Sequence, residues 1–122
     1  MTTVFNIRQW RTLNTVVIIE TTYFTRRIAT LMSDESYAAL QAHLLLHPEA
    51  GALIRGSGGL RKLRWELPGR GKRGGARVIY YWGVRRAVML MLAVYAKNEA
   101  EDLTQAQIKM LGEVVRKEFH DE

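Results

Sequence analysis

The segment 87–95 constrains the fold of this 122-residue chain more than any other part of it. Its sequence, AVMLMLAVY, is apolar throughout. The segment is far shorter than the roughly 18 residues of a membrane span, so we expect it inside a folded domain. A strand without polar positions is typical of the centre of a sheet that is covered on both faces. The chain is therefore predicted to fold around a central strand at 87–95.

Two segments before this apolar run also have the patterns of strands. In 60–67, Leu63, Trp65 and Leu67 alternate with charged residues, which predicts a strand with one buried and one charged face. Residues 77–82, RVIYYW, are β-branched and aromatic. Because the connections between the three strands are short, they are predicted to form an antiparallel meander.

The remaining segments predict one more strand and three helices. The β-branched run TVVII at 15–19 indicates a buried strand. Thr21 or Thr22, Ser33 and Thr104 can each cap the start of a helix, and Thr104 with Gln107 has the spacing of a capping box. The expected buried stripes are Phe24, Ile28 and Leu31; Tyr37, Leu40 and Leu44; and Ile108, Leu111, Val115 and Phe119.

These segments predict an α+β domain in the order β-α-α-β-β-β-α. The sheet should be small and mainly antiparallel, with the helices packed on one face. The length suits a single hydrophobic core, which we assign to residues 15–122. Residues 1–14 lack a clear period and are expected to form a loosely ordered extension.

Positive charge is concentrated in the stretch 55–77. It contains eight of the 18 lysines and arginines of the chain and a single acid, Glu66, while the rest of the chain is nearly neutral. Six of the eight are arginines, whose guanidinium groups suit phosphate, and seven glycines lie among them. Such a stretch could simply be a solvated surface, but its composition favours a polyanionic ligand.

Several kinds of chemistry are disfavoured by the sequence. There is no cysteine, which excludes thiolate metal sites and suits a cytoplasmic protein. The basic stretch contains no histidine and few carboxylates, and GRGKRGG lacks the ending of a phosphate-binding P-loop. His43 and His47 lie one helical turn apart, but without a third ligand nearby we interpret them as packing or surface residues. We therefore expect no metal and no cofactor.

Basic and aromatic residues along the predicted strands remain as candidates for binding RNA. Arginine grips phosphate, and aromatic rings stack on unpaired bases. RNA can also be cut by its own 2′-hydroxyl group, if cations position the phosphate and stabilise the charge of the transition state. Taken one by one, the aromatic residues are more often part of a core than of a binding surface.

Three motifs resemble the RelE superfamily of bacterial toxins, most closely its HigB type: GSGGLRKLRW at 56–65, GKRGGARVIYYW at 71–82 and AVYAKNEAEDLT at 93–104. The resemblance covers about residues 15–118. It implies a small RelE-like domain that enters the ribosomal A site in the cytoplasm and cuts mRNA without a cofactor. It also implies a cognate antitoxin, commonly a HigA-like helix-turn-helix protein, through which alone the toxin would meet DNA. No membrane partner is implied.

The resemblance also assigns residues. The implied catalytic residues are Lys62, Arg64, Arg77 and Lys97, and the candidate RNA-binding residues are Arg61, Arg70, Lys72, Arg73, Tyr95 and Asn98. The chain departs from the best-known members in its longer basic loop, 68–75, and in Leu103, where some members carry a tyrosine that stacks on the cut nucleotide. Either Tyr95 or the loop arginines could take over that role.

Two other functions are compatible with the same sequence. One is a toxin of the ParE branch of the superfamily, which poisons DNA gyrase and is not a nuclease. The other is an RNA-binding module that does not cut, whose affinity would fall steeply with salt. The basic triplet Lys62, Arg64 and Arg77 favours the nuclease over the ParE-like toxin.

Overall fold

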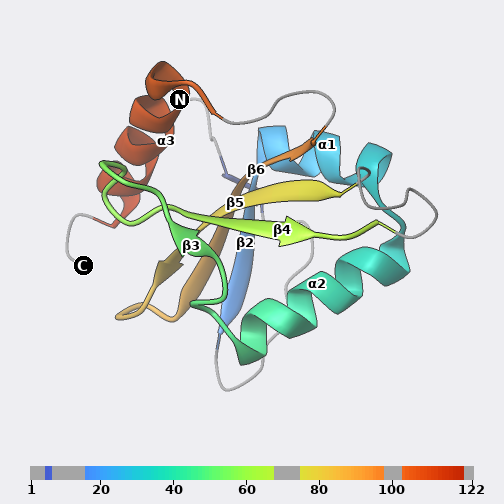
Figure 1. The fold of residues 1–122 in the computed structure, drawn as a ribbon. Coiled ribbons are helices and arrows are strands. Elements are labelled where there is room, and N and C mark those ends of the chain that lie inside the picture. Colours follow the sequence, from blue (N-terminus) through green and yellow to red (C-terminus); the bar gives the residue numbers. More distant parts are fainter. Residues whose placement is uncertain (1–4, 7–15, 68–74, 98–102, 120–122) are drawn as a thin grey trace.

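The computed structural model describes residues 5–6, 16–67, 75–97 and 103–119, with backbone only for the first pair. Within these ranges, no helix has the length and apolar character needed to cross a bilayer. Along the chain (Figure 1) the elements are β1 (Phe5–Asn6), β2 (Val17–Thr21), α1 (Thr22–Leu31), α2 (Asp34–Leu46), β3 (Ala52–Leu53), β4 (Arg61–Trp65), β5 (Ala76–Gly83), β6 (Val88–Ala96) and α3 (Gln105–Glu118).

The strands form one mixed sheet in the order β1-β2-β6-β5-β4-β3. Strand β2 runs parallel to β6, and the other four pairings are antiparallel. The α+β class, the meander β4-β5-β6 and the interior position of β6 are thus confirmed, and every residue of β6 is buried. Strands β1 and β3 were not predicted. The two residues of β1 fall in the segment expected to be loosely ordered, yet they pair with β2.

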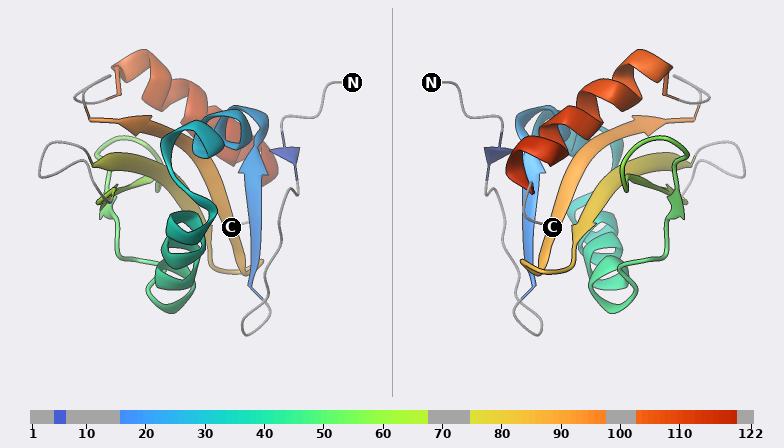
Figure 2. Two further views of the ribbon diagram at one scale, coloured as in Figure 1. Left: turned by 90° about the vertical axis from the view of Figure 1, so that its right-hand side faces the viewer. Right: turned by 90° about the vertical axis from the view of Figure 1, so that its left-hand side faces the viewer.

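Helices cover both faces of the sheet, so the prediction of helices on one face is wrong. The two views of Figure 2 show α1 and α2 on one side of the strands and α3 on the other. Each side has its own hydrophobic core. Phe24, Ile28 and Leu40 belong to the first core, whereas Val115 and Phe119 of α3 belong to the second. The reason is β6: a strand that is apolar at every position needs cover on both faces.

The helix starts agree with the caps predicted from the sequence. The Thr21 hydroxyl accepts a hydrogen bond from the Phe24 N–H (3.1 Å), and the Ser33 hydroxyl accepts one from the Ser36 N–H (3.1 Å). Thr104 and Gln107 form both bonds of a capping box at the start of α3. These bonds satisfy N–H groups that a helix leaves without internal partners.

Polar groups beneath α1 and α2 form hydrogen bonds at the first core. Glu20 of β2 is fully buried, and its carboxylate accepts hydrogen bonds from the hydroxyls of Thr25 (2.7 Å) and Tyr37 (2.5 Å). The Trp65 ring N–H donates to the Ser36 hydroxyl (3.1 Å). These bonds link β2 and β4 to the two helices, and we call this side of the sheet the closed face.

Strand β6 contains a β-bulge. Ile79 of β5 pairs with Ala93, but the next residue, Tyr80, pairs with Met91, so Leu92 has no partner in this register. The pairing with β2 extends only to Met91. The Leu92 carbonyl instead accepts a hydrogen bond from the buried hydroxyl of Thr21 (2.8 Å). An extra residue of this kind reverses the facing of the side chains that follow it.

Candidate functional site

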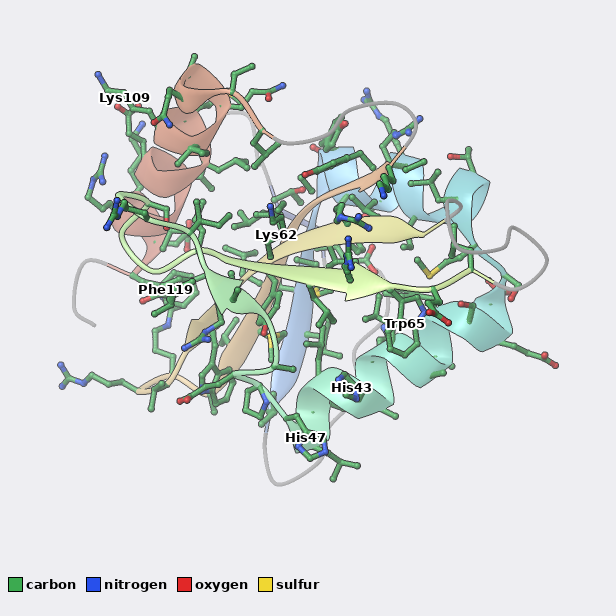
Figure 3. All side chains as sticks on the ribbon, in the orientation of Figure 1. His43, His47, Lys62, Trp65, Lys109 and Phe119 are labelled. Carbon is green, nitrogen blue, oxygen red and sulfur yellow. The ribbon has the colours of Figure 1, made fainter. Side chains whose placement is uncertain are left out.

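Four cationic side chains lie close together on the side of the sheet that α3 covers only in part. Arg64 of β4 pairs with Arg77 of β5, which in turn pairs with Tyr95 of β6, and residues paired across a sheet share a face. Lys62 is two residues from Arg64 and therefore shares its face. We call this region the cation face. Figure 3 shows Lys62 on the opposite side of β4 from Trp65.

The bulge in β6 completes the cation face. Leu90 and Leu92 belong to the core under α3, and strict alternation would then turn Tyr95 to the closed face. Because of the extra residue, Tyr95 packs in the core under α3 instead. Lys97, two residues further, follows the same alternation, and its N–H donates to the Gly75 carbonyl (3.0 Å). The bulge therefore directs Lys97 toward Arg77.

Arg77 is a buried cation, with only 7% of its surface exposed. The hydrogen bond found for its guanidinium group is a long one, 3.4 Å, to the carbonyl of the neighbouring Ala76. Within the described ranges, Arg77, Arg64 and Lys97 form no ion pair with a carboxylate. Arginine stays charged at any ordinary pH and offers five N–H donors. Burying such a group without an anion is costly, which indicates a site prepared for a negatively charged ligand.

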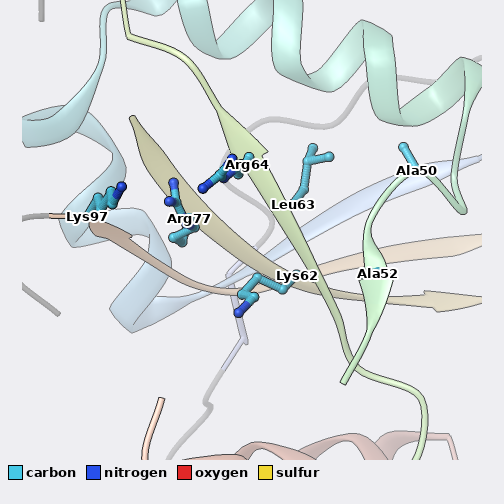
Figure 4. Close-up of a pocket in the computed structure, with 7 residues that line it drawn as sticks. All are labelled: Ala50, Ala52, Lys62, Leu63, Arg64, Arg77 and Lys97. Carbon is cyan, nitrogen blue, oxygen red and sulfur yellow. The ribbon is translucent and has the colours of Figure 1, made fainter. Parts of the chain in front are cut away.

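The cation face opens into a pocket with a volume of about 550 Å³. Its lining comes from the loop after α2, the edge strand β3, strands β4 and β5 and the residue that follows β6: Ala50, Ala52, Lys62, Leu63, Arg64, Arg77 and Lys97. In Figure 4, Arg64, Arg77 and Lys97 gather at one end of this pocket, and Ala50 and Ala52 lie toward the other. The pocket therefore has a cationic end and an apolar end.

The structure brings together all four residues predicted to be catalytic, since Lys62, Arg64, Arg77 and Lys97 line this one pocket. One detail differs from expectation. A charged residue at the start of a strand is ordinarily exposed, yet Arg77 is buried between neighbouring strands. Its position in β5, with β4 on one side and β6 on the other, removes it from solvent.

The predicted RNA-binding residues are placed differently. Arg61 alternates with Lys62 and so lies on the closed side of β4, where its guanidinium donates to the carbonyls of Glu49 (3.2 Å) and Gly51 (2.7 Å). Tyr95 lies beside Arg77, but it is 7% exposed and packs in the core under α3. Neither is thus placed to stack on or grip a ligand in the pocket. Arg70, Lys72, Arg73 and Asn98 lie outside the described residues.

The two histidines singled out in the sequence pack against each other on α2. Their ring centroids are 5.3 Å apart, and the His43 ring lies 5.8 Å from that of Trp65. In the described part of the chain, no group of three or more histidine, cysteine or carboxylate side chains could hold a metal ion. The packing interpretation of His43 and His47 therefore agrees with their surroundings.

Sequence reasoning missed the apolar end of the pocket. Ala50 and Ala52 follow the end of α2 in the stretch HPEAGAL, where the sequence indicates only that the helix stops. The loop that carries them is held by Tyr80, whose hydroxyl donates to the Pro48 carbonyl (2.8 Å) and accepts from the Gly51 N–H (2.8 Å). No local pattern relates Tyr80 to a loop about thirty residues earlier.

The arrangement as a whole can bind an anion and neutralise further charge on it. Fixed cations on a rigid sheet stabilise a developing negative charge with little rearrangement. Scanned against models of known protein families, the chain matches none of them. A function is therefore inferred from the chemistry of the pocket and from the sequence motifs.

Proposed function

We propose that this protein is the toxin of a type II toxin–antitoxin system and acts as a ribosome-dependent mRNA endoribonuclease. The observation that carries the proposal is Arg77, a buried guanidinium group without a carboxylate partner among the residues that the structure describes. It faces a pocket shared with Arg64 and Lys97. A phosphodiester of RNA supplies the anion that this group lacks. The RelE-like sequence motifs, which contain all four cations of the pocket, support the same proposal.

The proposed reaction uses the 2′-hydroxyl group of the RNA as the nucleophile. Its oxygen attacks the adjacent phosphorus, the P–O5′ bond breaks, and the products are a 2′,3′-cyclic phosphate and a free 5′-hydroxyl. Lys62 and Arg64 orient the RNA and favour the anionic form of the 2′-oxygen, and the 2′-hydroxyl proton passes to water. Arg77 stabilises the charge of the pentavalent transition state, and Lys97 donates a proton to the leaving oxygen or holds its phosphate. No cofactor enters this step.

The proposed setting follows from the substrate. The protein acts in the cytoplasm, in the ribosomal A site, where mRNA is held unpaired and extended. It is kept inactive by a cognate antitoxin of the helix-turn-helix kind, and it meets DNA only through that antitoxin. A reading frame for such a protein next to the gene is the genetic observation that we expect.

The test is to express the protein briefly in cells and to map the 5′ ends of mRNA. We expect new ends inside translated regions, and none of them when translation initiation is blocked or when Arg77→Met is expressed. Intact mRNA combined with arrested DNA replication would instead support a ParE-like gyrase poison. Salt-sensitive binding of RNA without any cleavage would support a non-catalytic RNA-binding module.

A further inference from the structure

The pocket continues beyond its cations to two alanines at the edge of the sheet. Ala52 of β3 pairs with Lys62 of β4, so the two side chains share a face, and Ala50 precedes it in the loop after α2. Both alanines are exposed to solvent. We call Ala50 and Ala52 the alanine shelf. Figure 4 shows it at the opposite end of the pocket from Lys97.

The loop beneath the shelf is held by four hydrogen bonds from two side chains. Tyr80 bonds to Pro48 and to Gly51, and Arg61 donates to the carbonyls of Glu49 and Gly51. Tyr80 is fully buried, and Arg61 pairs with it across β4 and β5. A short exposed loop does not need this many partners in order to turn. The bonds instead fix where the two methyl groups stand relative to the cations.

Gly51 shows how tightly the loop is held. A Cβ atom at this position would lie 2.8 Å from a ring carbon of Tyr80 and 3.1 Å from the Cβ of Arg61. No ordinary side chain fits at that distance, so glycine alone allows the loop to lie directly on Tyr80. The position of the alanine shelf at the sheet edge is therefore fixed by close packing of the loop on Tyr80.

We infer that the alanine shelf is a nucleoside subsite, which seats the base of a nucleotide whose phosphate is bound by Arg77 and Arg64. The inference rests on the proposed function. A nucleotide has an anionic end and a flat, largely apolar end, which is the same division that the pocket shows. Methyl groups offer a base a surface for van der Waals contact without hydrogen bonds of their own, so the subsite accepts more than one base.

The first measurement is the binding of small probes to the free protein, followed by NMR of the alanine methyl groups. The probes are adenosine 3′-monophosphate, ribose 5-phosphate and inorganic phosphate. We expect the nucleotide to bind about five- to tenfold more tightly than ribose 5-phosphate, the gain from the apolar area that a base would bury. The signals of Ala50 and Ala52 should shift with the nucleotide and stay in place with phosphate.

Two variants test the shelf itself. Ala52→Leu fills the subsite at an exposed position, so the protein should stay folded while the advantage of the nucleotide over ribose 5-phosphate is lost. Tyr80→Phe removes the two hydrogen bonds that hold the loop and does not fill the subsite. The preference for the nucleotide over ribose 5-phosphate should then fall about threefold. Phosphate binding should change less than twofold in both. The matched control is Ala39→Leu, the same exchange at an exposed position of α2, which should bind all three probes as the parent does.

Equal affinity of the parent for the nucleotide and ribose 5-phosphate overturns the inference, as does an unchanged preference in Ala52→Leu. The ribosome assay separates this failure from that of the proposed function. If the parent cuts mRNA but binds the nucleotide no better than ribose 5-phosphate, the proposed function stands and the nucleoside subsite is wrong. If the parent prefers the nucleotide but never cuts mRNA, the nucleoside subsite stands and the proposed nuclease function is wrong.

Discussion

The closed face and the cation face differ in whether their buried polar groups have hydrogen-bond or ion-pair partners. On the closed face, the buried carboxylate of Glu20 has two hydroxyl donors, and the Trp65 ring N–H has an acceptor. Gln41 on α2 departs from this pattern, because its buried amide has no hydrogen-bond partner among the described residues. On the cation face, Arg77 is buried, and its guanidinium group has one long hydrogen bond within the described part of the chain. Partnered groups stabilise the fold, whereas a buried charge left without an anion is better explained by a ligand.

Replacing Arg77 should have the largest effect on activity. Arg77→Met keeps an apolar stem and removes the charge, so the single-turnover rate of mRNA cleavage on ribosomes should fall about 10²- to 10³-fold. The free energy of unfolding should stay the same or rise, since an apolar group replaces a buried charge that lacks an ion pair. Rapid-quench cleavage assays and urea titrations measure the two quantities.

Arg116→Met is the control for this substitution, because Arg116 is exposed on α3. It should change neither the rate nor the stability appreciably. If Arg77→Met cuts at the parental rate, Arg77 has no place in the reaction. If it lowers the free energy of unfolding by more than about 2 kcal/mol, Arg77 serves the fold and the contrast between the faces disappears.

The Thr21 hydroxyl bonds both to the β6 bulge, at the Leu92 carbonyl, and to the start of α1 on the closed face. Thr21→Val removes the donor to the Leu92 carbonyl and the cap of α1 together. The expected loss of unfolding free energy is about 3 kcal/mol, the sum of an unpaired buried carbonyl and a missing cap. Because the bulge directs Lys97 into the pocket, the cleavage rate well below the unfolding midpoint should fall about tenfold as well. Chemical denaturation and single-turnover cleavage measure these effects.

Two controls separate the bulge from the helix cap. Thr21→Ser retains the hydroxyl and should restore the cleavage rate. Ser33→Ala removes the comparable cap of α2 and should cost about 1 kcal/mol of unfolding free energy without slowing cleavage. Equal rates for Thr21→Val and Ser33→Ala would show that Lys97 keeps its position without the Leu92 bond.

The sequence predicted those parts of the molecule that depend on local pattern. The caps at Ser33 and Thr104 and the alternation of Leu63 with charged residues follow from hydrogen bonding and side-chain period, which neighbouring residues determine. The four cations of the pocket were identified from motifs along three strands. They meet because those strands are sequential neighbours in a meander.

What the sequence did not predict depends on distant contacts. A bulge at Leu92 leaves no trace in AVMLMLAVY, because an apolar run has no alternation to interrupt. The burial of Arg77 results from its neighbours on both sides. The role of Arg61 results from a loop that Tyr80 and the pairing of β3 with β4 bring within its reach. Helices on both faces could have been inferred from the apolar run itself.

A smaller loss should follow on the closed face from Tyr37→Phe. The change leaves the Glu20 carboxylate buried with one fewer hydroxyl donor, so the free energy of unfolding should fall by about 2 kcal/mol in a urea titration. Cleavage well below the midpoint should continue at the parental rate. Tyr23→Phe, at an exposed position of α1, is the matched control and should leave both quantities unchanged. A slower reaction in Tyr37→Phe would mean that the two faces are coupled.

The smallest effect concerns the Tyr80 hydroxyl at high pH. Burial raises the pKa of this hydroxyl, while the Gly51 N–H and the charge of Arg61 act in the opposite direction. An unfolded tyrosine loses its proton near pH 10, and folded Tyr80 retains it to a higher pH. The folded state therefore holds more protons above pH 10, and stability must fall there as the pH rises.

The comparison with Tyr80→Phe isolates this group. Below pH 10, the parent should be more stable than the variant by about 1–3 kcal/mol, from the hydrogen bonds to Pro48 and Gly51. Above pH 10 the gap should narrow, by at most about 1.4 kcal/mol per pH unit, because only the parent has a Tyr80 proton to lose on unfolding. Urea titrations of both proteins from pH 8 to 11 measure the gap, and the other tyrosines and the lysines cancel because both proteins carry them. A gap that stays constant or widens would mean that the hydroxyl is not held as a buried neutral donor. The loop beneath the alanine shelf would then be held by Arg61 and by the pairing of β3 with β4.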